Sequence, residues 1–86
     1  KFSISQNYPN PFNPKTAINF TLPAESFVTL VIFDSLGKEV TKLIYEELPA
    51  GTYTREWNAD GFSSGTYFVR LQAGSYNDTK KITLLK

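Results

Sequence analysis

Residues Phe27-Val28-Thr29-Leu30-Val31-Ile32-Phe33-Asp34-Ser35-Leu36-Gly37 decide the fold class of this chain. Val28, Leu30 and Ile32 alternate along one face, and the opposite face is also largely apolar, which favours a central strand covered on both sides. Asp34 begins and Gly37 ends a four-residue segment typical of a type I hairpin turn. The stretch therefore predicts a strand, a tight turn and an antiparallel return strand.

The return segment, Glu39 to Leu48, is compatible with two structures. Its apolar residues match the stripe of an amphipathic helix. Flanking turns and β-branched residues favour a strand instead, in which the break in alternation between Val40 and Leu43 marks a β-bulge. We interpret the segment as a strand and retain the helix as the alternative.

Short alternating segments continue on both sides of this hairpin, separated by turns rich in Gly, Pro, Asn or Asp. They are Ala17–Leu22, Thr52–Asn58, Thr66–Gln72 and Tyr76–Leu85, with Phe2–Ser5 as a short additional strand. Turn signals about every 8 to 12 residues are typical of two packed antiparallel sheets. We therefore expect an all-β, immunoglobulin-like or fibronectin III-like antiparallel β-sandwich of six to seven strands, with Trp57 as the anchor of its core.

Composition limits both size and chemistry. The 86 residues allow one core, so we expect a single domain over residues 1–86. Nine Lys and Arg against eight Asp and Glu give a net charge of +1, too little to attract nucleic acid. Because the chain has no Cys and no His, the commonest nucleophile, general base and metal ligands are missing. We expect no catalytic residue, metal or cofactor.

Targeting segments are not visible in the sequence. The longest apolar run, residues 27–33, is far shorter than the roughly 20 residues that span a bilayer, so no transmembrane segment is expected. The chain opens with Lys1 and shows no signal-peptide pattern. We expect it to be a fragment of a longer protein.

The most unusual stretch is Gln6-Asn7-Tyr8-Pro9-Asn10-Pro11-Phe12-Asn13-Pro14. Its prolines exclude a helix and a central strand, and its Asn side chains can close local Asx turns. One interpretation is a recognition strap, since rigid Pro-rich segments bind at low entropic cost. The other is a structural plug, in which Tyr8 and Phe12 close the open end of the sandwich.

This stretch resembles the opening of the type A C-terminal sorting domain of bacterial type IX secretion, and the residues after it continue the resemblance: Thr16, Ile18, Phe20, Leu22 and Pro23. Further matches follow in order: Phe33-Asp34, Gly37, Val40, Ala50-Gly51, Trp57, Ser64-Gly65-Thr66-Tyr67-Phe68, Arg70-Leu71, Gly74 and the closing Lys80-Lys81-Ile82-Thr83-Leu84-Leu85-Lys86. The resemblance covers the chain from Gln6 onward. Arg55 departs from the pattern, in which that position is commonly apolar.

The resemblance implies an immunoglobulin-like, non-catalytic domain at the C-terminus of a secreted protein. Once the parent's signal peptide has carried it to the periplasm, the domain would address an N-terminal passenger to the outer-membrane translocon, for secretion or display on the cell surface. In that family a sortase commonly removes the domain and can join the passenger to an anionic lipopolysaccharide. The final strand is the part most associated with recognition, and it corresponds here to Lys80, Lys81, Ile82, Thr83, Leu84, Leu85 and Lys86.

The residues of this last strand have two interpretations of their own. A terminal strand at a sheet edge has unpaired backbone groups, to which a strand of another protein can add or through which two copies can form a homodimer. Alternatively, its lysines prevent aggregation at the edge while Ile82 and Leu84 fill the core. The residues alone leave both open.

Two functions of other classes remain as alternatives. The first is an accessory binding module whose exposed aromatic rings stack on a polysaccharide; the candidates are Tyr53, Trp57, Phe62 and Phe68. Arg55 would lie beside two of these rings, although such an arginine more often lays its stem over an aromatic. The second is a structural stalk domain inside a longer protein.

Overall fold

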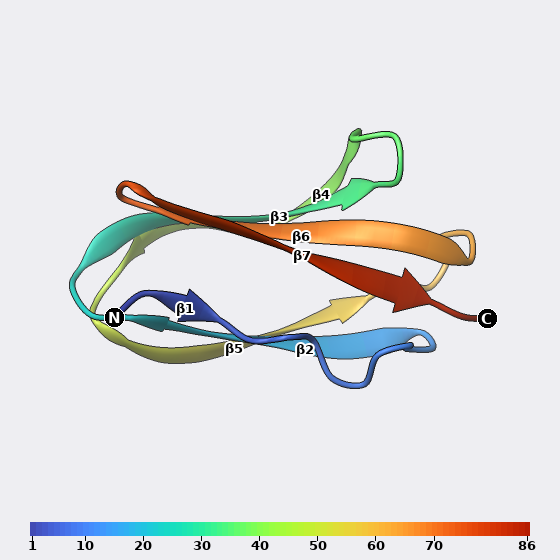
Figure 1. Cartoon of the computed structure of the whole chain (residues 1–86), viewed down its shortest axis with the longest axis horizontal. Coiled ribbons are helices and arrows are strands. Elements are labelled where there is room, and N and C mark those ends of the chain that lie inside the picture. The colour runs from blue at the N-terminus through green and yellow to red at the C-terminus, as the bar shows by residue number, and fades with distance from the viewer.

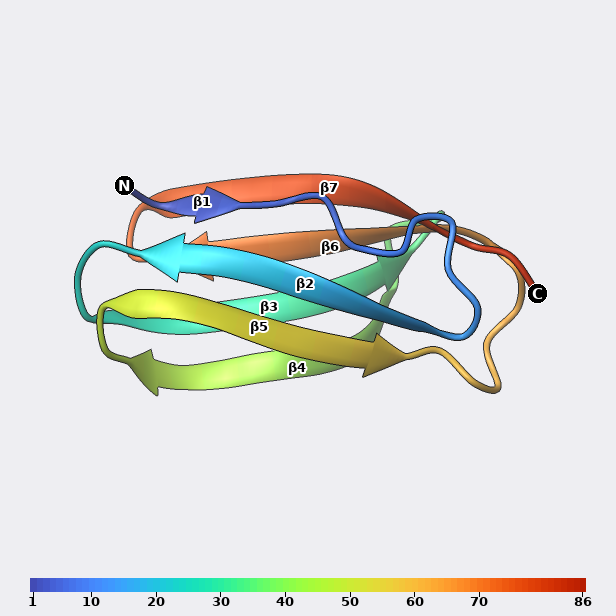
Figure 2. The same ribbon diagram turned by 90° about the horizontal axis from the view of Figure 1, so that it is seen from below.

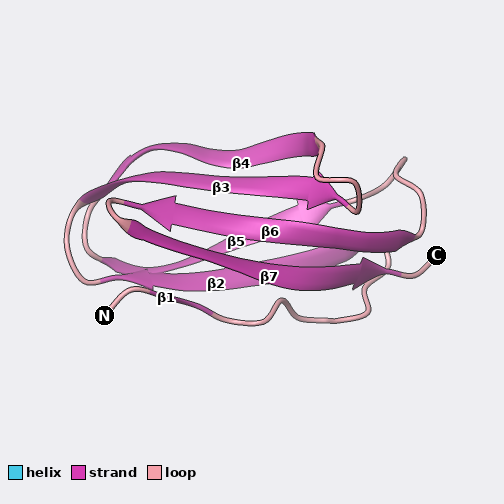
Figure 3. Cartoon of the chain, turned by 45° about the horizontal axis from the view of Figure 1, so that its top comes forward, coloured by secondary structure: helices cyan, strands magenta, loops and turns pink.

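The computed structural model describes all residues from 1 to 86, and every regular element in it is a strand. The strands are β1 (Ser3–Ile4), β2 (Lys15–Leu22), β3 (Ser26–Asp34), β4 (Glu39–Leu48), β5 (Gly51–Asn58), β6 (Gly65–Ala73) and β7 (Tyr76–Leu84). They form a three-stranded sheet, β1-β2-β5, and a four-stranded sheet, β4-β3-β6-β7, and all neighbouring pairs are antiparallel. The two sheets face each other (Figure 1 and Figure 3), so the predicted immunoglobulin-like sandwich is confirmed.

Alternation along β2 places one of its faces in the core. Ile18, Phe20 and Leu22 are fully buried, while Asn19 between them is exposed. The Phe20 ring stacks on Tyr53, its partner in the register of β5, with ring centroids 5.3 Å apart. The strand ends directly before Pro23, which cannot donate to a ladder. This segment follows its sequence prediction closely.

The central position of β3, between β4 and β6, is also confirmed. The expectation that it is covered on both sides is wrong for part of its outer face. Val31 is buried there, in register with Lys42 on one side and Arg70 on the other, but Phe27 is exposed and Phe33 only half-buried. No third layer packs against this face, so its rings are shielded only by neighbouring side chains of the same sheet.

The turn between β3 and β4 has the predicted form. Gly37 N donates to Asp34 O at 3.0 Å, and Asp34 N donates to Lys38 O at 2.8 Å. The Asp34 carboxylate also accepts from the backbone of Leu36 and Lys38, each at 2.9 Å. Gly37 has a φ of 86°, a conformation that a residue with a Cβ rarely adopts. Asp and Gly therefore each have a structural reason to stand where they do.

The ambiguous segment is a strand, not a helix, and it contains the predicted bulge. Its register with β3 shifts twice, at Leu43 and at Val40, and neither of these residues has a partner on β3. Each shift inserts an extra residue and breaks the two-residue alternation. Both side chains remain packed against the core, which explains why the sequence pattern also resembled a helical stripe.

Trp57 on β5 is the centre of an aromatic cluster at one end of the sandwich. It is buried, and its ring centroid lies 5.6 Å from Phe12, 5.6 Å from Phe62 and 5.5 Å from Tyr67. The cluster joins Phe12 to three rings from a single short stretch, residues 57–67. The prediction that Trp57 anchors the core is confirmed.

Tyr67 fixes the corner between β5 and β6. Its hydroxyl donates to the Ser63 carbonyl, four residues earlier, at 2.7 Å, an arrangement typical of immunoglobulin-like sandwiches. Gly65 begins β6 with a φ of 149°, where a side chain would be strained. Both residues of the sequence motif thus have structural roles at this corner.

The molecule is elongated, with Cα extents of 37 × 22 × 16 Å. The two ends of the chain lie at opposite ends of its long axis (Figure 1). The structure contains no helix that could serve as a membrane span.

Candidate functional site at the C-terminal strand

The C-terminal strand β7 forms one edge of the four-stranded sheet, with β6 as its strand neighbour. Ile82 and Leu84 are fully buried and anchor it to the core. Lys81 and Lys86 are exposed, and Leu85 is 60% exposed. The segment therefore presents a leucine and two lysines to solvent on a firmly held backbone.

The outer edge of this segment is covered by residues Gln6–Pro14, which we call the strap (Figure 2). Phe12 N donates to Thr83 O, and Leu85 N donates to Phe12 O, each at 2.9 Å. Phe12 and Leu84 form an isolated parallel β-bridge. The strap thus acts as a very short extra strand beside the end of β7.

Two side chains of the strap form further hydrogen bonds with the backbone of β7, as a neighbouring strand would. Asn10 Oδ1 accepts from Thr83 N at 3.1 Å, and Gln6 Nε2 donates to Lys81 O at 2.8 Å. Alternate residues of an edge strand direct their backbone groups outward, and those of Thr83 are fully occupied. The predicted unpaired edge is therefore wrong for most of residues 81–85, although no strap bond reaches the first residues of β7.

The strap is also bonded to the other sheet. Tyr8 and Ala17 exchange two backbone hydrogen bonds, Tyr8 N to Ala17 O at 3.0 Å and Ala17 N to Tyr8 O at 2.9 Å. At its end, the Pro14 carbonyl accepts from Ala59 N at 2.8 Å. The strap therefore bridges the two sheets along one open side of the sandwich.

The plug interpretation of the strap is right for Phe12 and wrong for Tyr8. Phe12 is 2% exposed and packs on Trp57, whereas the Tyr8 side chain is 78% exposed. Tyr8 pairs with β2 through its backbone, and successive side chains of an extended segment point to opposite sides. Its neighbour Asn7 is the residue that points inward and is buried.

A family model described as the secretion system C-terminal sorting domain matches residues 6–85. The chain belongs to this family of type IX secretion sorting domains. The match begins at Gln6 and ends at Leu85, which are also the outermost residues whose hydrogen bonds join the strap to β7. No curated protein shows significant similarity to the chain.

Asn7 holds the strap of this sorting domain in its bent path. Its Nδ2 donates to Thr16 Oγ1 at 2.9 Å and to Pro9 O at 3.2 Å, and its Oδ1 accepts from Gln6 Nε2 at 2.7 Å. Thr16 Oγ1 donates in turn to Pro9 O at 2.9 Å. Asn7 and Thr16 are both buried, so water cannot readily replace a hydrogen-bond partner that this network loses.

Replacing Asn7 with alanine is expected to lower the free energy of unfolding by about 1 to 3 kcal/mol, because Pro9 O and Thr16 Oγ1 lose a buried donor. Urea unfolding of the variant, followed by Trp57 fluorescence, measures the loss. Asn13→Ala is the matched control, since Asn13 lies in the same strap but is exposed. Equal effects of the two substitutions would contradict the role given to the network.

The last residue of the sorting domain is bonded to the connection between β5 and β6. Lys86 N donates to Ser64 Oγ at 3.0 Å, in the connection between β5 and β6. Lys80, near the middle of β7, is half-buried because it lies on the core side of the strand with Ile82. The predicted recognition segment is therefore divided between exposed and core-facing side chains.

The start of β7 is held against β1. The Phe2 and Tyr76 rings stack with centroids 5.3 Å apart. The Tyr76 hydroxyl donates to Asp78 Oδ2 at 3.2 Å. Burial, and then the charge of Asp78 and this bond, raise the pKa of Tyr76 above its usual value of 10.0, so the hydroxyl keeps its proton.

The predicted aromatic platform does not form. Trp57 is buried, and Phe62 packs against it. Tyr53 is half-buried and donates to Pro49 O at 2.6 Å, with Arg55 over its ring at 5.7 Å. Phe68 lies on the other sheet, on its outer face. Arg55 therefore lies over an aromatic ring, as the commoner of its two interpretations predicts.

Acidic side chains do not converge anywhere in the sorting domain. No group of three or more Asp or Glu residues is close enough together to hold a metal ion. What the structure does provide at the end of β7 is a set of exposed side chains on a backbone fixed by the strap.

Proposed function

We propose that this sorting domain is a non-catalytic export signal. It directs an N-terminal passenger from the periplasm across the outer membrane through the type IX translocon, to the cell surface or the medium. The family match over residues 6–85 carries the proposal. Residues 1–86 act in it as one domain, whose core is a single cluster of buried side chains.

The translocon recognises the segment Lys80–Lys86 through its side chains rather than by adding a strand to it. Strand addition needs free backbone groups at the edge, and the strap occupies those of Thr83 and Leu85. The exposed groups that remain are Lys81, Leu85 and Lys86. An apolar side chain between cations fits a partner with an apolar contact surrounded by carboxylates.

The shape of the domain keeps these residues accessible. A passenger joined before Lys1 lies at one end of the long axis, and Lys86 lies at the other (Figure 1). We propose that the sortase, after export, cuts between the passenger and the domain. That cut falls at the end far from the recognised side chains, so recognition and cleavage do not compete for one surface.

A simple truncation after Thr79 is a poor test, because it also removes Ile82 and Leu84 from the core and frees the strap. The sharper variant is the pair Leu85→Ser and Lys86→Glu, which changes only exposed side chains. Its matched control is Leu36→Ser with Lys38→Glu at the tip of the β3–β4 turn, where Leu36 is 91% exposed. Both variants make the same change in composition and charge.

We expect a fluorescent reporter with a periplasmic signal peptide and residues 1–86 at its C-terminus to reach the surface or medium of a bacterium with type IX secretion. The Leu36/Lys38 control is expected to be exported like the unaltered fusion. The Leu85/Lys86 variant is expected to stay in the periplasm. Fractionation and fluorescence of intact cells measure the distribution. Normal export of the Leu85/Lys86 variant contradicts the recognition proposal. Retention of the unaltered fusion, while the host exports its own cargo, contradicts the export proposal itself.

A further inference from the structure

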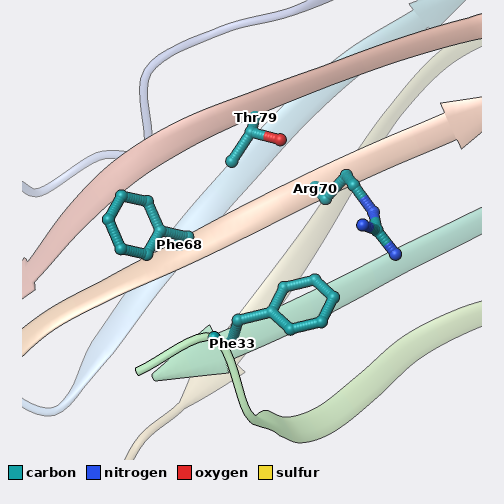
Figure 4. A pocket seen from close by; sticks show the side chains of 5 residues that line it. Phe33, Phe68, Arg70 and Thr79 are labelled. Atoms are coloured by element: carbon teal, nitrogen blue, oxygen red, sulfur yellow. The ribbon is translucent and has the colours of Figure 1, made fainter. Parts of the chain in front are cut away.

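The outer face of the four-stranded sheet carries a hollow that the sorting function does not use. It has a volume of about 230 Å³ and is lined by Phe33, Gly37, Phe68, Arg70 and Thr79 (Figure 4). The lining side chains come from β3, β6, β7 and the β3–β4 turn. The hollow therefore lies over the central strands β3 and β6. No strap residue lines it, and Lys81 of β7 stands beside it, in register with Phe68.

Arg70 is the unusual group in this hollow. Its guanidinium lies over the Phe33 ring, with Cζ 4.7 Å from the ring centroid. Its Nε is buried without a hydrogen-bond partner and is the only buried side-chain nitrogen or oxygen in that condition. Its cross-strand neighbours, Val31 and Thr79, bring no negative charge. A half-buried cation without a bonded acceptor favours an anion in the hollow, because desolvated charges are stabilised by pairing.

A second hollow lies on the same face. It has a volume of about 400 Å³ and is lined by Phe27, Thr29, Tyr45, Gln72 and Gly74. Phe27 and Tyr45 are exposed and form an edge-to-face pair with centroids 4.9 Å apart. Phe27 and Phe33 stand six residues apart on β3, so at about 3.3 Å per residue the two hollows together extend over roughly 20 Å of the face. That span fits a chain of linked sugars better than a single small molecule.

The lining of both hollows alternates flat rings with hydroxyl, amide and guanidinium groups. Rings accept the C–H face of a sugar, and the polar groups bond its hydroxyls. An extended peptide would gain its affinity from backbone pairing at a strand edge, but the hollows lie on the face of the sheet, where the backbone is already bonded within the ladder. The chemistry therefore favours a saccharide over a peptide.

The charges on this face favour an acidic saccharide. Arg70 is flanked by Lys42 on β4, whose ammonium lies 4.6 Å from the Tyr45 ring centroid, and by Lys81, which is in register with Phe68. The carboxylates of Glu39 and Glu47 stand at the β4 margin of the face, opposite Phe33 and Phe27 in the register. The centre and the β7 side of the face are thus cationic.

We propose that this outer face binds an acidic polysaccharide. The carboxylate of one sugar pairs with the accessible end of the Arg70 guanidinium, and its ring packs on Phe68. A neighbouring part of the same chain lies over Phe27 and Tyr45. This binding site is distinct from the export signal, because none of residues 80–86 lines either hollow. Lys81 only stands beside the first hollow, where it adds positive charge.

The test is isothermal titration calorimetry of the 86-residue chain with soluble polygalacturonate. Parallel titrations use the fully methyl-esterified polymer, which keeps the sugar rings and lacks the negative charge, or polyglutamate, which keeps the charge and lacks the rings. Arg70→Gln is compared with Arg55→Gln, a matched loss of an arginine that also lies over an aromatic ring but on the other sheet.

We expect polygalacturonate to bind the unaltered chain more tightly than either control polymer. Arg70→Gln is expected to weaken binding about tenfold or more, the effect of losing a charge-assisted bidentate pair. Arg55→Gln, and the Leu85→Ser and Lys86→Glu pair, are expected to leave the affinity within about twofold of the original. If Arg70→Gln fails to fold, as judged by thermal unfolding, Arg70→Lys keeps the charge and still removes the flat fork.

Three results would overturn the proposal. One is equal weakening by the Arg70 and Arg55 substitutions, which would indicate a general effect of charge. Another is binding of polyglutamate or of the esterified polymer as tight as that of polygalacturonate. The third is no binding of polygalacturonate by the unaltered chain.

Discussion

Replacement of Trp57 by alanine is expected to remove most of the stability of the domain. A buried Trp to Ala change costs about 3 to 5 kcal/mol, while a domain of this size has about 5 to 10 kcal/mol in total. Trp57 also contacts three rings, Phe12, Phe62 and Tyr67, and each aromatic pair adds about 0.5 to 1.5 kcal/mol beyond the area it buries. With no disulfide to limit the unfolded state, the variant should be largely unfolded at 37 °C.

Circular dichroism during urea and thermal unfolding measures this effect, since the variant lacks its only Trp. Trp57→Phe is the control, because it keeps a ring among the same neighbours and should lose only part of the stability. A loss below about 1 kcal/mol in Trp57→Ala would mean that the cluster is not the anchor of the core.

Phe12→Ala is expected to cost about 3 to 5 kcal/mol. The ring is buried against Trp57, and the Phe12 backbone supplies both hydrogen bonds of the bridge to β7. A loosened strap also uncovers the outer groups of Thr83 and Leu85. The variant should therefore associate at high concentration, as sheets with open edges do.

Urea unfolding and light scattering at several concentrations measure the two effects of Phe12→Ala. Tyr8→Ala is the matched control, since Tyr8 is in the same strap with its side chain in solvent, and it should lose less than about 0.5 kcal/mol. Similar losses in the two variants would remove Phe12 from the core. Dimerisation of the unaltered domain through its edges remains a prediction, and over residues 81–85 the strap opposes it.

The strands of this fold could be predicted because their signals are local. In β2, Ile18 and Phe20 alternate with polar neighbours, and Pro23 ends the strand. Even the bulges of β4 left a signal, because Val40 and Leu43 break the two-residue period. The predicted strands are nevertheless shorter than the observed ones at several ends, as in β2, which begins at Lys15 rather than Ala17.

The covering of β7 could not be predicted in the same way. It depends on bonds between Gln6 and Lys81 and between Asn10 and Thr83, which are more than 70 residues apart. A side-chain amide that takes the place of a backbone group leaves no periodic pattern in the sequence. The orientation of Tyr8 was missed for a related reason, because the pairing of an isolated residue with β2 decides it.

The outer-face hollows were missed because alternation was interpreted only for the core. Phe68, Arg70 and Gln72 share the outer face of β6, and Phe33 lies beside Phe68 in the register. Large aromatic residues at outward positions of a central strand were the available signal. Only the strand order shows that those of β3 and β6 stand side by side.

The bonds of the strap have a consequence for synthesis of the protein. Phe12 leaves the ribosome some seventy residues before its partners Thr83 and Leu85. A chain that stops before Thr83 has no partner for this residue and cannot close the side of the sandwich. Closure therefore reports that translation has continued through Leu85, and a secretion pathway that accepts only the closed form would reject prematurely terminated cargo.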